Sequence, residues 1–235
     1  MHELHEYLKN PTHPITILVV GCGGTGSYVV TQLAKMQIAL AELRGLQLEV
    51  MVMDDDIVEP HNVGRQLFSP SDVGFFKSDV IVNRVNRFYG LEWESLPYRF
   101  EENIKTNIVI SCVDNVKTRL KIKKEFDYKK VSGTEYETLF YWIDFGNSKY
   151  TGQYVISDQN NLKDVIELFG EMKETPDEPS CSMAESLNQQ DLFINLQLAT
   201  SGINLLYKLL RTGSIDYSGQ FLNTETGFTR PILIK

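Results

Sequence analysis

Runs of consecutive apolar residues alternate along the chain with segments in which apolar residues recur at helical spacing. Ile15–Val20 and 107–114 are short, rich in β-branched residues and end at a glycine turn or an acid. Such runs are typical of strands buried on both faces. The pattern predicts further strands at 46–54, 137–146 and 152–157, helices at 25–43, 78–90, 115–126 and from 182 to about 210, and a closing hairpin over 214–223 and 227–235.

The apolar positions also predict how two of these helices behave. In the helix over 78–90 we expect Ile81, Val85 and Phe88 to point inward, because they lie three or four residues apart. In the last helix we expect an interruption at Gly202, since glycine weakens a helix interior. Ser182 and Glu185 form the S-x-x-E pattern that is typical of a helix start.

A glycine-rich turn links the first predicted strand to the first predicted helix. In "VVGCGGTGSYVV" the glycines Gly21, Gly23 and Gly26 fit G-x-G-x-x-G, and Gly24 lies between them. Glycines allow backbone N–H groups to approach a phosphate, and the helix amino terminus adds partial positive charge. The next strand ends at Asp54, whose carboxylate can accept hydrogen bonds from ribose hydroxyls. The alternative is a tight turn of purely structural value, with Asp54 as a solvated turn residue. For Asp55 we expect the role of a solvated turn residue.

The order of these elements predicts an α/β fold. A Rossmann-like nucleotide-binding core has a mostly parallel sheet with helices on both faces, and the later strands extend it in antiparallel fashion. The length of 235 residues suits a single domain over 1–235. We expect 1–14 to be an amino-terminal extension, and the acidic, proline-rich 171–181 to be a mobile loop.

Composition narrows the functional classes. The net charge of −8 argues against binding along a nucleic-acid backbone, which requires a basic face. There is no apolar run long enough to cross a membrane and no apolar centre of a signal peptide. Three dispersed cysteines suit a reducing compartment, so we expect a cytoplasmic protein. There is no C-x-x-C pair, so we expect no structural zinc.

The segment "EPHNVGRQLFSPSDVGFFK" contains the side chains that a triphosphate requires. Arg65 and Lys77 can neutralise phosphate oxygens and the charge that develops during displacement, and Asn62 and Gln66 add hydrogen-bond donors. Hydride transfer would not use such a cluster. The alternative is that these cations are exposed and only keep the protein in solution.

The segment "SCVDN" places Asp114 just after a buried strand. Ligands of parallel sheets gather at the carboxyl ends of the strands, and a carboxylate there can hold a Mg²⁺ ion that bridges phosphates. The alternative is that Asp114 caps the helix that follows, and the two roles are compatible.

Together, "GCGGTG", "DDDIVEPHNVGRQLFSPSDVGFFK" and "CVDN…R" resemble the ThiF/MoeB family, relatives of the ubiquitin-activating enzymes. Three segments most resemble the ThiF-type proteins of the bacterial PRTRC cassette. They are "NVGRQLFSPSDVG", "NRVNRFYGL" and "PSCSMAESLNQQDLFIN". The resemblance covers nearly the whole chain, and the block from 54 to 77 is its most specific part.

The resemblance implies ATP-dependent adenylation of the C-terminal carboxylate of a ubiquitin-like protein. It implies ATP and Mg²⁺ as cofactors and a homodimer. It implies a ubiquitin-like protein as the partner, with an E2-like protein as a further candidate. Nucleic acid and membrane are not expected partners. The implied roles follow the motifs: Gly21, Gly23, Gly24 and Gly26 line the nucleotide, Asp54 binds the ribose, Asn62, Arg65, Gln66 and Lys77 hold the phosphates, and Asp114 holds Mg²⁺.

Cys181 is the one cysteine with a chemical role in this interpretation. It precedes a predicted helix start, and that position lowers the pKa of a thiol. It also corresponds roughly to the cysteine that forms a thioester in some family members. The alternative is a small loop residue. Cys22 and Cys112 are expected to be buried packing residues.

One feature departs from the family pattern. Relatives carry an amino-terminal arginine that reaches the ATP of the partner subunit, whereas the first 14 residues here contain no arginine. This leaves a second hypothesis, a scaffold of the same fold that binds nucleotide or partner without turnover. A third hypothesis, an NAD(P)-dependent oxidoreductase, fits the glycine turn but not Arg65 and Lys77.

Overall fold

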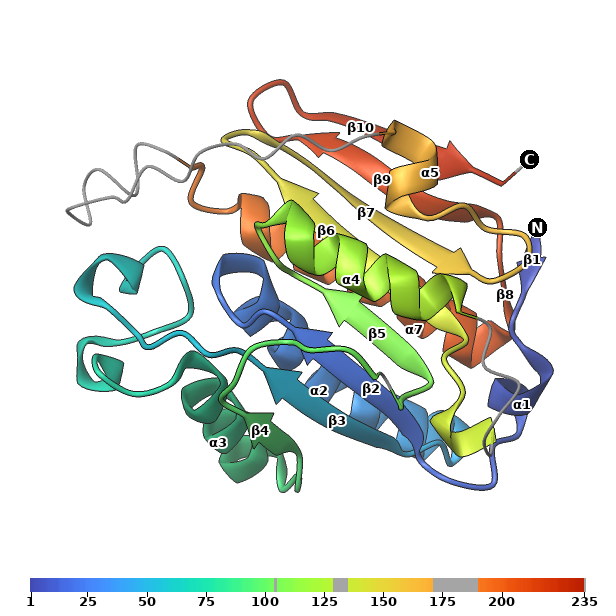
Figure 1. Cartoon of the computed structure of the whole chain (residues 1–235), viewed down its shortest axis with the longest axis horizontal. Helices are drawn as coiled ribbons and strands as arrows, with labels where there is room; N and C mark the ends of the chain where they lie inside the picture. Colours follow the sequence, from blue (N-terminus) through green and yellow to red (C-terminus); the bar gives the residue numbers. More distant parts are fainter. Residues whose placement is uncertain (104, 129–134, 171–189, 235) are drawn as a thin grey trace.

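The computed structural model describes residues 1–103, 105–128, 135–170 and 190–234. One eight-stranded sheet runs through this part of the chain, in the order β10-β9-β7-β6-β5-β2-β3-β4 (Figure 1). Its parallel part contains β2 (Ile15–Val20), β3 (Leu48–Met53), β4 (Glu94–Leu96), β5 (Ile108–Ser111) and β6 (Tyr141–Asn147), and its antiparallel part contains β7 (Thr151–Asp158), β9 (Tyr217–Asn223) and β10 (Phe228–Leu233). The predicted sheet is therefore confirmed.

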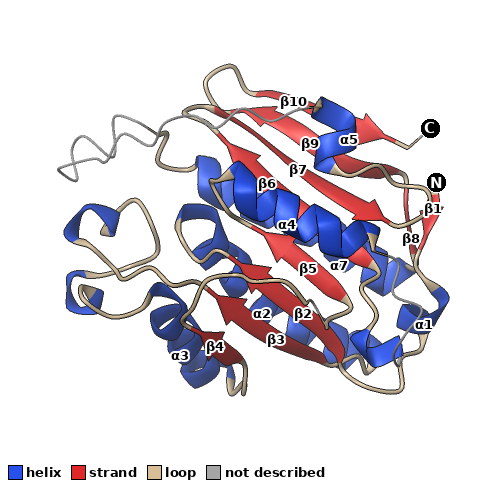
Figure 2. Cartoon of the chain, in the orientation of Figure 1, coloured by secondary structure: helices blue, strands red, loops and turns tan. Residues whose placement is uncertain are grey.

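Helices cover both faces of the sheet. On the face that is turned to the viewer in Figure 2 lies α4 (Val116–Asp127), and behind the sheet lie α2 (Gly24–Arg44) and α7 (Ile194–Thr212). The helix α3 (Lys77–Tyr89) packs beside α2 near the β4 edge, and the short α5 (Val165–Phe169) follows β7. A small antiparallel pair joins β1 (His2–Glu3) to β8 (Ser214–Ile215), and α1 (Glu6–Lys9) follows β1.

Side chains of β2 point alternately to the two faces of the sheet, which explains why there is one hydrophobic core on each face. Ile17 and Val19 belong to the larger core, which is shared with α2, α3 and α7, whereas Leu18 and Val20 belong to the smaller core under α4. Successive side chains of a strand point to opposite faces, so a strand covered on both sides must be apolar throughout. No helix in the described ranges combines the length and apolarity needed to cross a bilayer.

Two details differ from the sequence predictions, and two further predictions are not tested. Phe88 is 78% exposed, because the helical face that Ile81 and Val85 bury does not extend to it. Gly202 does not interrupt α7. It lies buried within the helix, where an added Cβ would collide with the ring of Phe145, so glycine is needed for close packing against β6. The predicted helix start at Ser182 and the predicted loop over 171–181 lie outside the described residues.

The sheet reverses its strand order beside β2. The chain passes from β2 to β3 and β4 on one side, then returns to β5 on the other side. The carboxyl ends of β2 and β5 therefore diverge at a topological switch point, where ligands bind in open α/β sheets.

Candidate nucleotide site

A cavity of about 630 Å³ opens at the carboxyl ends of β2, β3 and β5. This volume falls within the range of small-molecule sites. Its apolar surface includes Val20, Met53, Phe100 and Val113, and its charged surface includes all three residues that were predicted to act together, Arg65, Lys77 and Asp114. All three side chains therefore border one cavity, and their joint action over the glycine turn stays a prediction.

The glycine turn is compressed between β5 and α2. Gly21 has a φ of +91°, and a Cβ on it would lie 2.8 Å from the carbonyl oxygen of Cys112. A Cβ on Gly26 would collide with the carbonyl oxygen of Gly21. Side chains are therefore excluded at both positions, and the amino terminus of α2 opens into the cavity through Gly23 and Gly24. A helix amino terminus of this kind attracts anions.

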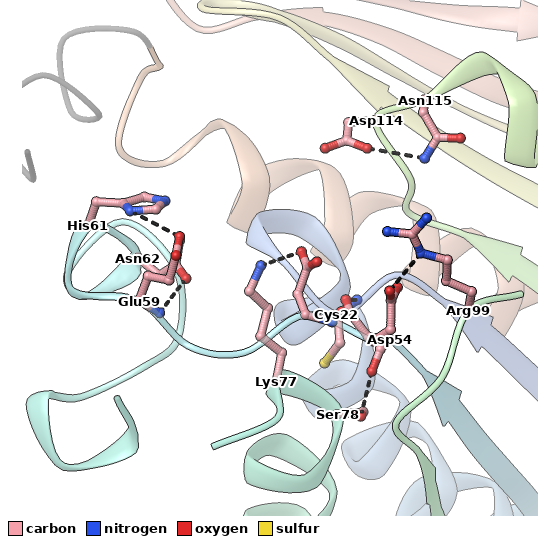
Figure 3. Close-up of polar contacts among 12 residues, drawn as sticks. Cys22, Asp54, Glu59, His61, Asn62, Lys77, Ser78, Arg99, Asp114 and Asn115 are labelled. Carbon is pink, nitrogen blue, oxygen red and sulfur yellow. Dashed lines mark hydrogen bonds and ion pairs between the residues drawn. The ribbon is translucent and has the colours of Figure 1, made fainter. Parts of the chain in front are cut away.

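Asp54 lies at the end of β3 and faces the glycine turn. Its carboxylate accepts hydrogen bonds from the backbone N–H of Cys22 and, at 2.8 Å, from that of Asp56 (Figure 3). Burial raises the pKa of Asp54, and the two backbone hydrogen bonds and Lys77 partly oppose this shift. An ionised carboxylate has about four lone-pair sites, so capacity remains for ribose hydroxyls.

Lys77 and Arg99 are each paired with an acid that follows Asp54. The Nζ atom of Lys77, which begins α3, lies 2.8 Å from Oδ2 of Asp56, and its side chain is only 10% exposed. Arg99 Nε lies 2.7 Å from Oδ2 of Asp55 at the exposed rim. Asp55 is exposed, as expected of a solvated turn residue, and forms a surface ion pair with Arg99. A bound phosphate would compete with Asp56 for Lys77.

The loop after Asp54 supplies Arg65 and Gln66 to the cavity. Arg65 Nη1 donates to Oε1 of Gln190 at 3.0 Å. Gln66 is 7% exposed, and its buried Oε1 has no hydrogen-bond partner among the described residues. An unpartnered buried polar atom is costly, so the site is incomplete at this point without a ligand or a rearranged amide.

Asn62 does not line the cavity. Its Oδ1 accepts from the backbone N–H of Glu59 at 2.9 Å, within the short turn η1 (Pro60–Asn62), and the residue is 2% exposed. The structure thus places Asn62 in a capping role outside the cavity lining, apart from Lys77 and Asp54 (Figure 3).

Asp114 lies beyond β5 at the opposite wall from Asp54. It is exposed, and its Oδ1 accepts from Asn115 Nδ2 at 3.4 Å. Asn115, not Asp114, is the N-cap of α4, because its side chain accepts from the N–H of Thr118 at 2.8 Å. The alternative that Asp114 caps this helix is therefore wrong. The described residues hold no group of three or more His, Cys, Asp or Glu side chains that could bind a metal ion.

Arg119 and Asp144 support the wall that carries Asp114. Arg119 Nε lies 2.9 Å from Oδ1 of Asp144, and Arg119 Nη2 donates to the carbonyl of Phe145 at 2.9 Å. Burial raises the pKa of Asp144, and Arg119 and Ser111 oppose this shift. The pair fixes the start of α4 against the end of β6.

The two cysteines of the described chain lie in surroundings that disfavour the thiolate form. Cys22 is fully buried, Cys112 is half-buried, and burial raises the pKa of both thiols. Their expected role as packing residues agrees with this environment. Cys181 lies outside the described residues.

Sequence reasoning missed several residues that line the cavity. Asn195, in the first turn of α7, is 1% exposed and bonds to the first turn of α2. Asparagines and glutamines in loops and at helix starts carry no distinctive spacing, so only the fold brings them together. The missed residues that line the cavity include Tyr98, Arg99, Lys117, Lys121, Asn147, Gln190 and Asn195.

Comparisons with known proteins agree with this fold. Among curated proteins no sequence matches the chain. Among solved structures, PaaA matches with a TM-score of 0.64 and 15% identity, and MccB of E. coli with 0.64 and 17%. Both alignments cover 97% of this chain, but only 65% of PaaA and 64% of MccB, so the chain spans less than two thirds of either protein. The likeness shows a shared fold.

A family model gives the more specific result. The model of the ThiF family matches residues 10–230, which is most of the chain and includes the glycine turn, the segment with Arg65 and Lys77, and Asp114. The chain therefore belongs to the ThiF family.

Proposed function

We propose that the chain is an ATP-dependent adenylyltransferase that activates the C-terminal carboxylate of a ubiquitin-like protein. The observation that carries the proposal is that the glycine turn, Asp54, Arg65, Lys77 and Asp114 all line one cavity. Membership of the ThiF family supports the adenylation. Solved structures of MccB with ATP and with AMPCPP plus MccA, at TM-scores of 0.63 and 0.66, support a nucleotide and a protein partner in this fold.

Each group has a defined task in the proposed reaction. The amino terminus of α2 receives phosphate oxygens, and the carboxylate of Asp54 accepts hydrogen bonds from the ribose. Arg65 and Lys77 offset the repulsion between the incoming carboxylate and the phosphates, while Gln66 adds an amide donor. Asp114 would hold Mg²⁺, which neutralises phosphate charge when bound.

The chemical step is a displacement at the α-phosphorus. An oxygen of the partner's terminal carboxylate forms a bond to the α-phosphorus, the bond from that phosphorus to the bridging oxygen breaks, and pyrophosphate leaves with the electron pair. The product is an acyl adenylate. No nucleophilic side chain is needed for this step, so the site contributes mainly orientation and charge.

ATP–pyrophosphate exchange tests the proposal. Exchange should require a small β-grasp protein with a free C-terminal glycine carboxylate, and the same protein with an amidated C-terminus should give none. Asp114→Ala should abolish exchange, whereas the matched Asp216→Ala, at an exposed acid remote from the cavity lining, should leave it unchanged.

The other hypotheses predict different results. ATP binding without exchange toward any β-grasp protein would favour the scaffold, and binding of NADH without affinity for ATP would favour the oxidoreductase. Undiminished exchange in Asp114→Ala would remove Asp114 from the site.

Further parts of the interpretation remain predictions. These are the transfer to Cys181, the homodimer, the E2-like partner, the cytoplasmic location and the closeness to PRTRC proteins. A thioester between the partner and the chain that is lost in Cys181→Ala, with exchange retained, would support the transfer.

A further inference from the structure

Asn195 is a fully buried polar side chain whose hydrogen bonds connect separate parts of the cavity wall. Its Oδ1 accepts from the hydroxyl of Thr25 at 2.8 Å and from Nδ2 of Asn147 at 2.9 Å. Its Nδ2 donates to Oε1 of Gln190 at 2.9 Å. Because a buried amide costs free energy unless it is bonded, these contacts fix the orientation of Asn195.

The contact to Gln190 connects Asn195 to Arg65. Oε1 of Gln190 also accepts from Arg65 Nη1 at 3.0 Å, so one amide oxygen receives hydrogen bonds from both residues. The donor from Asn195 therefore adds a second hydrogen bond that keeps the amide oxygen of Gln190 turned toward Arg65. Without Asn195, the amide of Gln190 is held only from the side of Arg65, and the position of the guanidinium is less strictly fixed.

The contact to Thr25 connects Asn195 to the glycine turn. Thr25 is the second residue of α2, and a Cβ on the adjacent Gly24 would lie 2.8 Å from Nδ2 of Asn195. Asn147 ends β6. A single side chain thus holds the amino terminus of α2, the end of β6 and the guanidinium of Arg65 in one arrangement.

We propose that Asn195 is a positioning residue, which sets Arg65 through Gln190 and holds the phosphate-binding end of α2. The inference rests on the proposed function, because the ligand that benefits is the triphosphate of ATP. Asn195 itself need not touch the nucleotide. Its effect should therefore depend on the presence of Arg65.

A double-mutant cycle on ATP affinity tests this dependence. We expect Asn195→Ala to raise the Kd for MgATP, measured by calorimetry, about tenfold, which is the size of one typical net hydrogen bond. In the Arg65→Ala background the same change should raise Kd by no more than about twofold. Gln190→Ala, at a half-buried loop position, should raise the Kd for MgATP to a similar extent. It replaces Asn195→Ala in the cycle if Asn195→Ala does not fold.

The control is Asn204→Ala, an exposed asparagine on the same helix, which should leave Kd unchanged. Equal and additive effects of Asn195→Ala with and without Arg65 would overturn the positioning role. A second cycle on urea unfolding of the nucleotide-free protein should show coupling between Asn195 and Arg65. If the wild-type chain binds no ATP, the proposed function fails, and this second cycle still decides whether Asn195 positions Arg65.

Discussion

Replacing Arg119 by methionine should destabilise the fold strongly. The change leaves the carboxylate of Asp144 buried without its cation, and Oδ2 of Asp144 already has no hydrogen-bond partner in the described chain. The side chains of Arg119 and Asp144 are only 10% and 2% exposed, so solvent screens the pair weakly. Removing one partner of a buried ion pair costs about 3–5 kcal/mol. For a chain of this length such a loss lowers Tm by roughly 6–20 °C.

The pH dependence of this loss follows from Asp144. Burial raises the folded pKa of Asp144 above the ordinary value of 3.8 for an aspartate, and removal of Arg119 raises it further. Stability is therefore lost as pH rises through the folded pKa and is regained as pH falls toward 3.8. Urea unfolding of wild type and Arg119→Met should show the largest difference at neutral pH and a smaller difference in acid.

Two further variants make the test specific. Arg119→Met combined with Asp144→Asn should recover most of the lost free energy of unfolding, because the uncompensated charge is gone. Lys117→Met, an exposed change on the same helix, should cost little. A loss of less than 1 kcal/mol in Arg119→Met, or a loss that does not change with pH, would refute this account of the pair.

Three other outcomes are expected. Burial lowers the pKa of His2 and His5 below the ordinary value of 6.5 for a histidine, so their contribution to the free energy of unfolding should be complete above pH 6.5 and decline as pH falls below it. Urea unfolding should show this decline, and the double variant His2→Gln, His5→Gln should flatten it. Gly26→Ala should abolish MgATP binding in calorimetry, because the new methyl group collides with the carbonyl of Gly21; unchanged affinity would mean that the turn adapts. Cys22 should resist alkylation in the native protein, since its thiol is buried with a raised pKa; rapid labelling detected by mass spectrometry would contradict the described packing.

The sheet and most helices could be predicted from sequence because their signals are local. Ile15–Val20 is apolar on both faces, and the structure shows a core on each side of it. Phe88 and Gly202 were misjudged because their burial depends on distant packing. Helical spacing places Phe88 with Ile81, but the packing partners of α3 end before it, and Gly202 is explained only by the ring of Phe145.

The candidate site likewise contains some residues whose position the sequence predicted and others whose position it did not predict. Arg65, Lys77 and Asp114 occur in motifs whose spacing indicates phosphate chemistry, and all three line the cavity. Asn62 occurs in the same motif but bonds to the backbone of Glu59. No local sequence motif marks Asn195 as a residue of the site, because its hydrogen-bond partners Thr25 and Asn147 are 170 and 48 residues away along the chain.

The strand order has a consequence for synthesis of the protein on the ribosome. The wall that closes over Gly21 comes from Cys112, and β5 pairs with β2 across about 90 residues of intervening chain. A nascent chain that has exposed only β2, α2 and β3 holds the glycine turn but lacks this wall. The chain can therefore bind a nucleotide only after β5 and β6 have emerged from the ribosome. A truncated translation product that ends before these strands should bind no nucleotide.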